Sequence, residues 1–129
     1  MKLKAIYSYP ETKTPYSRRF YPTSVLQQAF EEKYFREMNE ASAIPVFADT
    51  CYDRPIGCCH ATLHDRTVEL DLTIGDKAYE DFLEDYTRMS CTLGGAGNVN
   101  HQGTVESLYL TGAHFSTINN LKCQITKED

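Results

Sequence analysis

The sequence lacks several features that would each point to a class of protein. Clustered basic residues are missing: the 129 residues carry a formal net charge of −5, and Arg18-Arg19 is the basic pair that stands out. Because phosphate binding needs clustered Lys and Arg, we expect no nucleic-acid partner. No stretch reaches the roughly 20 apolar residues of a membrane span, so we expect no membrane partner. Tryptophan is absent too, and the aromatic residues are nine tyrosines and six phenylalanines.

A signal-peptide pattern and an even set of cysteines are lacking as well. The stretch Met1–Tyr7 turns polar and reaches Pro10 too soon to supply the apolar region of a signal peptide. The five cysteines, at positions 51, 58, 59, 91 and 123, are odd in number and too sparse for a secreted disulfide scaffold. We therefore expect free thiols, mostly small core residues, in a protein that is made and kept in the cytosol.

The length allows one domain over residues 1–129, built on one core. Residues 9–22 contain three prolines and several polar residues, so we expect a long loop or an extended arm there. The aromatic and basic side chains of this arm suit a contact surface on a neighbouring subunit. Its candidate binding residues are Tyr16, Arg18, Arg19, Phe20 and Tyr21.

Hydrophobic periodicity predicts the secondary structure. Alternation predicts strands over 2–8, 43–48, 56–63, 66–74, 89–93 and 104–111, with a hairpin turn at His64-Asp65. Ser24 and Gln27 form a capping-box pattern that starts a helix running to about Asn39, and a second helix follows Gly75. We expect a flexible turn at 94–97 and fraying from residue 122. Consecutive hairpins predict an α+β fold, in which two helices pack on a mainly antiparallel, curled or barrel-like sheet.

Three stretches carry a resemblance to a known family. They are Ser17–Ala29, which contains Tyr21-Pro22 before a helix; Ile44–Asp49 followed by Pro55-Ile56-Gly57; and Met89–Gly97, which is rich in glycine. In this order they resemble the prohead core proteases of tailed phages, distant relatives of the herpesvirus assembly proteases. The resemblance implies a prohead-protease-like fold, with Ser90 at the position of the nucleophile and His114 near that of the second histidine.

The chain departs from that family at one position. Where the family has its first catalytic histidine, this chain has Asp49-Thr50-Cys51, and a threonine cannot act as general base near neutral pH. Our leading hypothesis is therefore a catalytically inactive phage head-assembly protein, acting as a capsid-associated structural component. Its expected partners are other phage structural proteins or further copies of itself in an oligomeric assembly, in the host cytoplasm or in the virion.

Two alternatives remain open. The first is a minimal active serine endopeptidase of head maturation, with Ser90 as nucleophile, His60 or His114 as base, and the glycines near the oxyanion. The second is a small acidic host-interaction protein that engages a basic partner through the carboxylates of the second helix. Whether the chain is an enzyme is therefore undecided at this point.

A cluster of Cys and His residues is the candidate for metal binding. Cys58, His60 and His64 point to one face of their predicted strand, close in sequence to Cys51 and Cys59. Such groups could hold zinc, but this spacing is not a recognised zinc pattern, and adjacent cysteines point to opposite faces. We therefore expect no metal and no cofactor, with the cysteines serving in packing.

Overall fold

The computed structural model describes residues 1–49 and 53–128. The strands are Lys2–Ser8 (β1), Ile44–Phe47 (β2), Gly57–His64 (β3), Thr67–Ile74 (β4), Ser90–Val99 (β5), Val105–Ser116 (β6) and Gln124–Glu128 (β7). The helices are Thr23–Glu31 (α1), Lys33–Glu40 (α2) and Asp76–Phe82 (α3), with a short 3₁₀ turn at Tyr86–Arg88 (η1).

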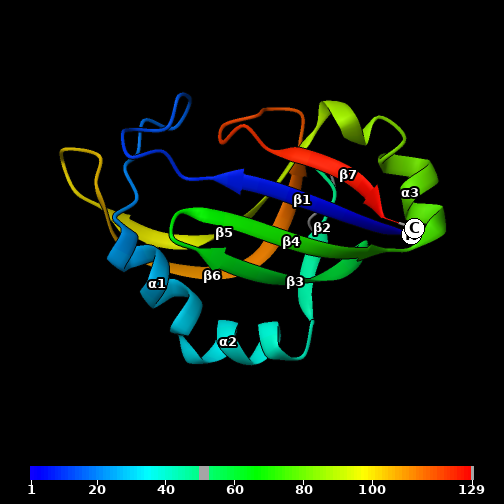
Figure 1. Cartoon of the computed structure of the whole chain (residues 1–129), viewed down its shortest axis with the longest axis horizontal. Helices are drawn as coiled ribbons and strands as arrows, with labels where there is room; N and C mark the ends of the chain where they lie inside the picture. Colours follow the sequence, from blue (N-terminus) through cyan, green and yellow to red (C-terminus); the bar gives the residue numbers. More distant parts are fainter. Residues whose placement is uncertain (50–52, 129) are drawn as a thin grey trace.

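The strands form one seven-stranded sheet in the order β5-β6-β2-β3-β4-β1-β7. Strands β2 and β6 run parallel, and the other neighbouring strands run antiparallel. Figure 1 shows the sheet curling, with α1 and α2 along one side and α3 beside the C-terminus. The architecture is α+β with a curled, half-barrel sheet, which confirms the predicted fold class.

The inner face of the curled sheet carries the core. The alternation predicted for β4 is confirmed, since Val68, Leu70, Leu72 and Ile74 are each at most 1% exposed. Several of their register partners on β1 and β3 are buried as well, among them Leu3, Ala5 and Ala61. Because side chains alternate between the two faces of a strand, the residues between them point to the outer face. The helices cover part of the core with Leu26, Ala29 and Phe35.

The curl brings the two ends of the sheet, β5 and the β1–β7 pair, against each other. The N–H of Leu93 donates to the Tyr7 hydroxyl oxygen at 2.9 Å. The N–H of Cys91 donates to Cys123 Sγ at 3.5 Å, and the Cys123 thiol donates to the Cys91 carbonyl at 3.5 Å. Side chains therefore satisfy backbone groups of β5 that a further strand would satisfy in a closed barrel. We call this line of contacts the seam.

The predicted helix from Ser24 to Asn39 is wrong in one respect, because two helices occupy that stretch. The chain breaks at Glu32, which has ψ of 136°, and the Glu32 carboxylate accepts the N–H groups of Tyr34 and Phe35 at the start of α2. The described part of the chain thus has three helices instead of two. None of them is long and apolar enough to cross a membrane.

The capping box is also wrong, since α1 begins at Thr23 with Pro22 as N-cap and no side-chain cap. At the other end of this segment, the Asn39 side chain makes the two backbone hydrogen bonds that a neighbouring strand would otherwise make. Its amide donates to the Ala61 carbonyl and accepts the Ala61 N–H, both at 2.8 Å. This pair satisfies β3 where the β2–β3 pairing, which reaches Cys59, has ended.

Three local predictions on the strands are corrected. The glycine run is no flexible turn but lies within β5, where a Cβ on Gly95 would overlap the Tyr109 carbonyl oxygen, so only glycine permits the close approach. The predicted fraying is wrong for Gln124–Glu128, because these residues pair with β1 as β7. The hairpin turns at Asp65-Arg66, one residue later than predicted, and Asp65 has a positive φ of 56°.

The predicted arm folds back onto its own domain. Arg66, 8% exposed, holds both ends of it: its guanidinium donates to the carbonyls of Tyr9 (3.0 Å), Pro10 (2.7 Å) and Tyr21 (2.6 Å). A further bond runs to the Thr23 hydroxyl at 2.9 Å. Residues 9–22 are therefore an ordered loop closed by one buried arginine, because its planar donors reach several carbonyls at once.

The seam generates a stability prediction. Replacing Tyr7, 2% exposed, by Phe removes the acceptor and leaves the Leu93 N–H buried without a partner. We expect the free energy of unfolding to fall by about 1–3 kcal/mol. Urea denaturation followed by circular dichroism measures it, with Tyr34→Phe on the exposed side of α2 as the control. An unchanged midpoint in Tyr7→Phe would show that the seam does not depend on this bond.

Candidate functional site

The candidate site lies on the outer face of β5 and β6. In the ladder Ser90 pairs with Ser116 and Thr92 pairs with His114, so all four side chains share one face. Together with the arm tip and the segment after β6 they surround a hollow of about 320 Å³. Its lining is Tyr16, Ser17, Ser90, Thr92, His114, Ser116, Ile118 and Asn120. The structure thus brings two of the three predicted catalytic residues, and one predicted binding residue, to the same place.

Ser90 is buried in this hollow, with 3% of its surface exposed. Its hydroxyl donates to the Ile118 carbonyl oxygen at 2.9 Å, and the Ser116 carbonyl lies at 3.4 Å. A hydroxyl whose proton is held by a backbone carbonyl is not activated by a base, which would have to accept that proton itself. Ser90 therefore ties the start of β5 to the chain leaving β6.

His114 leans away from Ser90. Its ring stacks on Phe47 of β2, with centroids 5.2 Å apart and an interplanar angle of 17°. Its Cδ2 and Nε2 atoms lie 3.3 and 3.6 Å from the place that a Cβ of Gly94 would occupy. Gly94 and Ser90 are the two residues diagonal to His114 on β5. Their Cα atoms lie roughly 7–8 Å from the His114 Cα, on opposite sides of it along the strand direction. The ring has taken the space over glycine, so it is directed away from the serine.

Burial lowers the pKa of His114 below its usual value of 6.5. The charged imidazolium is disfavoured where the ring is partly removed from water. The neutral imidazole is therefore favoured at pH 7, in a hollow whose lining, as far as the structure describes the chain, contains no carboxylate and no Lys or Arg.

His60 lies too far away to replace the missing base. It is on β3, and the sheet order places β6 and β2 between β3 and β5. At about 4.8 Å per strand, three steps correspond to roughly 14 Å. This exceeds by far the 2.6–3.2 Å that direct proton transfer from Ser90 requires. The prediction of His60 as base is therefore wrong.

Cys58, His60 and His64 do lie on one face of β3, as expected. Because β3 is extended over its whole length, these side chains are far from one another. Cys58 and His64 are six residues apart, about 20 Å along the strand. Among the described residues no group of three His, Cys, Asp or Glu side chains could hold a metal ion. Cys51 lies outside the described residues, as does Thr50.

The predicted binding residues divide into two groups. Tyr16, 69% exposed, and Arg18 and Arg19 present their side chains to solvent. Phe20 and Tyr21 are half-buried: the Phe20 backbone pairs with the start of β6, and the Tyr21 ring packs against Tyr9 with centroids 4.9 Å apart. These two aromatic residues hold the arm in place, so only the first three remain candidates for contacts.

Sequence reasoning missed several residues that shape the site. Asn120 binds the arm tip, since its side chain accepts the Tyr16 N–H at 3.0 Å and donates to the Ser17 hydroxyl at 3.3 Å. Ile118, 58% exposed, stands beside Tyr16 in the same lining. Their sequence, Thr117-Ile118-Asn119-Asn120, carries loop-forming residues, and loops that a sheet positions are frequent binding elements.

The lowered pKa of His114 predicts a pH dependence of stability. Because the folded-state pKa lies below the unfolded value of about 6.5, the unfolded chain binds the proton more tightly. The contribution of this residue is complete above pH 6.5 and is lost as the pH falls through the folded-state pKa. We expect His114→Phe to flatten the decline in unfolding free energy below pH 6.5, and His101→Gln, in an exposed turn, to retain the wild-type profile. Urea titrations between pH 4.5 and 8 test this; a His114→Phe profile parallel to wild type would contradict it.

Comparison with known proteins identified no relative of this chain. No family model matches the chain, no curated protein matches it, and no solved structure matches its fold. The interpretation of the site therefore rests on its geometry.

Proposed function

We propose that this chain is a phage head-assembly protein that acts as a structural, capsid-associated component and has no protease activity. The observation that carries the proposal is the environment of Ser90, whose hydroxyl proton goes to the Ile118 carbonyl. The resemblance of the three sequence stretches supports the head-assembly role, and the geometry of the serine supports the loss of catalysis.

An active serine protease would need a different arrangement. Its nucleophile must be accessible and must lie within hydrogen-bond reach of a base. Ser90 is 3% exposed, His60 is three strands away, and the ring of His114 lies over Gly94. The glycines that would flank an oxyanion continue along β5 as a paired strand. These features together favour the structural role over the protease alternative.

The contact surface that fits a structural role is the exposed rim of the site. Tyr16 and Ile118 are 69% and 58% exposed and flank the same hollow. Asn120 joins their two loops through its bonds to Tyr16 and Ser17. Because the rim is already ordered, a partner that binds it loses little further conformational entropy on association. Tyrosine is also among the residues that most often dominate binding energy at interfaces.

The proposed inactivity predicts the behaviour of Ser90 towards an active-site probe. We expect no labelling of the folded wild-type protein by a fluorophosphonate, because the hydroxyl is buried and bonded to a carbonyl. Gel fluorescence and intact mass measure it, with a known serine protease as positive control. Labelling of wild type that disappears in Ser90→Ala would move the protease alternative to first place.

The proposed assembly role predicts association with phage heads. Mass spectrometry of proheads and mature virions from the encoding phage should find the chain at a reproducible copy number. Tyr16→Ala combined with Ile118→Ala should lower that number roughly tenfold, as expected for loss of a central contact. Tyr34→Ala, at a residue 75% exposed on α2, is the matched control and should leave it unchanged. Absence of the wild-type chain from both particles would refute the role.

A further inference from the structure

A second surface, which adjoins the site above at Asn120, lies where β7 stops pairing with β1. The β1–β7 ladder ends at the pair Ile6 and Gln124, whereas β1 continues its pairing with β4 as far as Ser8. In the same register the residue opposite Ser8 would be Lys122. Lys122 has a positive φ of 49°, a left-handed conformation that turns the chain away from β1. One edge of β1 is therefore left without a partner strand at Ser8.

The direction of the backbone groups at Ser8 follows from its neighbour. The Tyr9 N–H donates to the Arg66 carbonyl at 2.8 Å, so Tyr9 faces the β4 side. In an antiparallel ladder alternate residues direct their N–H and C=O groups to opposite edges. The N–H and C=O of Ser8 therefore point to the side that β7 has left. Extended peptides bind such edges by adding a strand.

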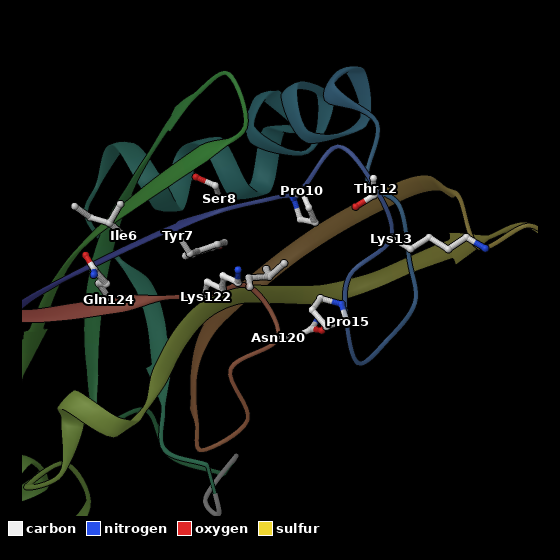
Figure 2. Close-up of a pocket in the computed structure, with 11 residues that line it drawn as sticks. Ile6, Tyr7, Ser8, Pro10, Thr12, Lys13, Pro15, Asn120, Lys122 and Gln124 are labelled. Carbon is white, nitrogen blue, oxygen red and sulfur yellow. The ribbon is translucent and has the colours of Figure 1, made fainter.

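A hollow of about 570 Å³ occupies this place (Figure 2). The end of β1, the arm between Pro10 and Pro15, and the segment between Asn120 and Gln124 form its walls. Its accessible apolar lining residues are Ile6, which is 38% exposed, the half-buried Pro10 and the exposed Pro15. The hollow thus offers an apolar surface beside an unpaired strand edge, which is the combination that peptide-binding grooves use.

The positive charge of the lining residues favours an acidic partner. Lysines 13 and 122 contribute to its lining and, within residues 1–49 and 53–128, no carboxylate does, although the chain has a net charge of −5. Lys13 extends away from the β1 edge in Figure 2, and its Nζ lies 3.4 Å from where a Cβ of Gly103 would be. Lys122, at the position where β7 departs, is therefore the cation placed to meet a ligand that pairs with Ser8.

We propose that this hollow docks a short, extended, acidic segment of another protein, which continues the line of β7 and pairs with the free edge of β1 at Ser8. The segment exchanges backbone hydrogen bonds with Ser8, packs on Ile6 and the two prolines, and places a carboxylate near Lys122. The inference is independent of the head-assembly role, because binding to the isolated chain measures it directly.

A synthetic peptide tests the proposal. The probe is fluorescein-labelled Thr-Val-Glu-Val-Glu-Val with a free C-terminus, titrated by fluorescence anisotropy at 50 mM salt. We expect saturable binding to the wild-type chain, weakened several-fold by 0.5 M salt because the contact with Lys122 is exposed. The neutral probe Thr-Val-Gln-Val-Gln-Val amide should bind at least threefold more weakly. Equal affinities of the two probes, or no binding of the acidic probe at 1 mM protein, would overturn the proposal.

Variants locate the binding on the protein. Lys122→Gln should weaken the acidic probe three- to tenfold and leave the neutral probe unchanged, whereas Lys127→Gln, on the exposed part of β7, should change neither. Ser8→Pro removes the backbone N–H and should abolish binding, while Ser8→Ala keeps the backbone donor and should retain it. Circular dichroism confirms that each variant is folded before titration. Wild-type affinity in both Lys122→Gln and a folded Ser8→Pro would refute the assigned site.

Discussion

The seam between the two ends of the sheet is the constraint on which the rest of the structure depends. The sheet begins at β5 and ends at β1 and β7, and its ends meet through the Tyr7 hydroxyl and the Cys123 thiol. A tyrosine reaching from β1 to Leu93 fixes how tightly the sheet curls, since a flatter sheet would leave buried backbone N–H groups without acceptors. The curl in turn divides the molecule into an inner face that is the core and an outer face that carries the site.

The closure also explains why the candidate site is a poor catalytic centre. Ser90 lies on the outer face, one residue before the seam residue Cys91, and the returning chain at Ile118 covers its hydroxyl. The Ser90 hydroxyl donates to a backbone carbonyl instead of to a histidine, and the ring of His114 lies over Gly94. In this fold the buried serine instead holds two segments together.

The sequence predicted the features that depend on local periodicity. The alternation of β4 and the first strand were evident because each apolar position faces one core. The break at Glu32 was not, since glutamate is a good helix former and the carboxylate caps α2 only after the chain has turned. The glycine run was wrongly predicted as a turn because glycine occurs both in turns and where another backbone segment approaches closely. The second case applies here, and the approach of the Tyr109 carbonyl to Gly95 is a tertiary contact that the sequence does not reveal.

The sequence predicted only part of the candidate site, because tertiary contacts decide the rest. Ser90 and His114 do share a face, but their separation depends on the ladder register, which no local pattern reveals. Arg66 gave no signal at all, because a single arginine in a hairpin turn is usually a solvated residue. Its importance comes from four acceptors in Tyr9, Pro10, Tyr21 and Thr23, which only the folded chain brings together.

The chemistry of the seam gives the protein a built-in reporter of local opening. A conventional barrel is closed by a ladder of backbone bonds, whereas this one is closed by a phenol and a thiol, so the seam is the line along which sub-global unfolding would cost least. Burial raises the pKa of both Cys91 and Cys123, which keeps the thiols protonated and unreactive while the seam is shut. The rate of thiol exchange at these two cysteines would therefore depend on how often and how long the seam opens. Exchange at Cys91 and Cys123 would report this local opening without an engineered cysteine.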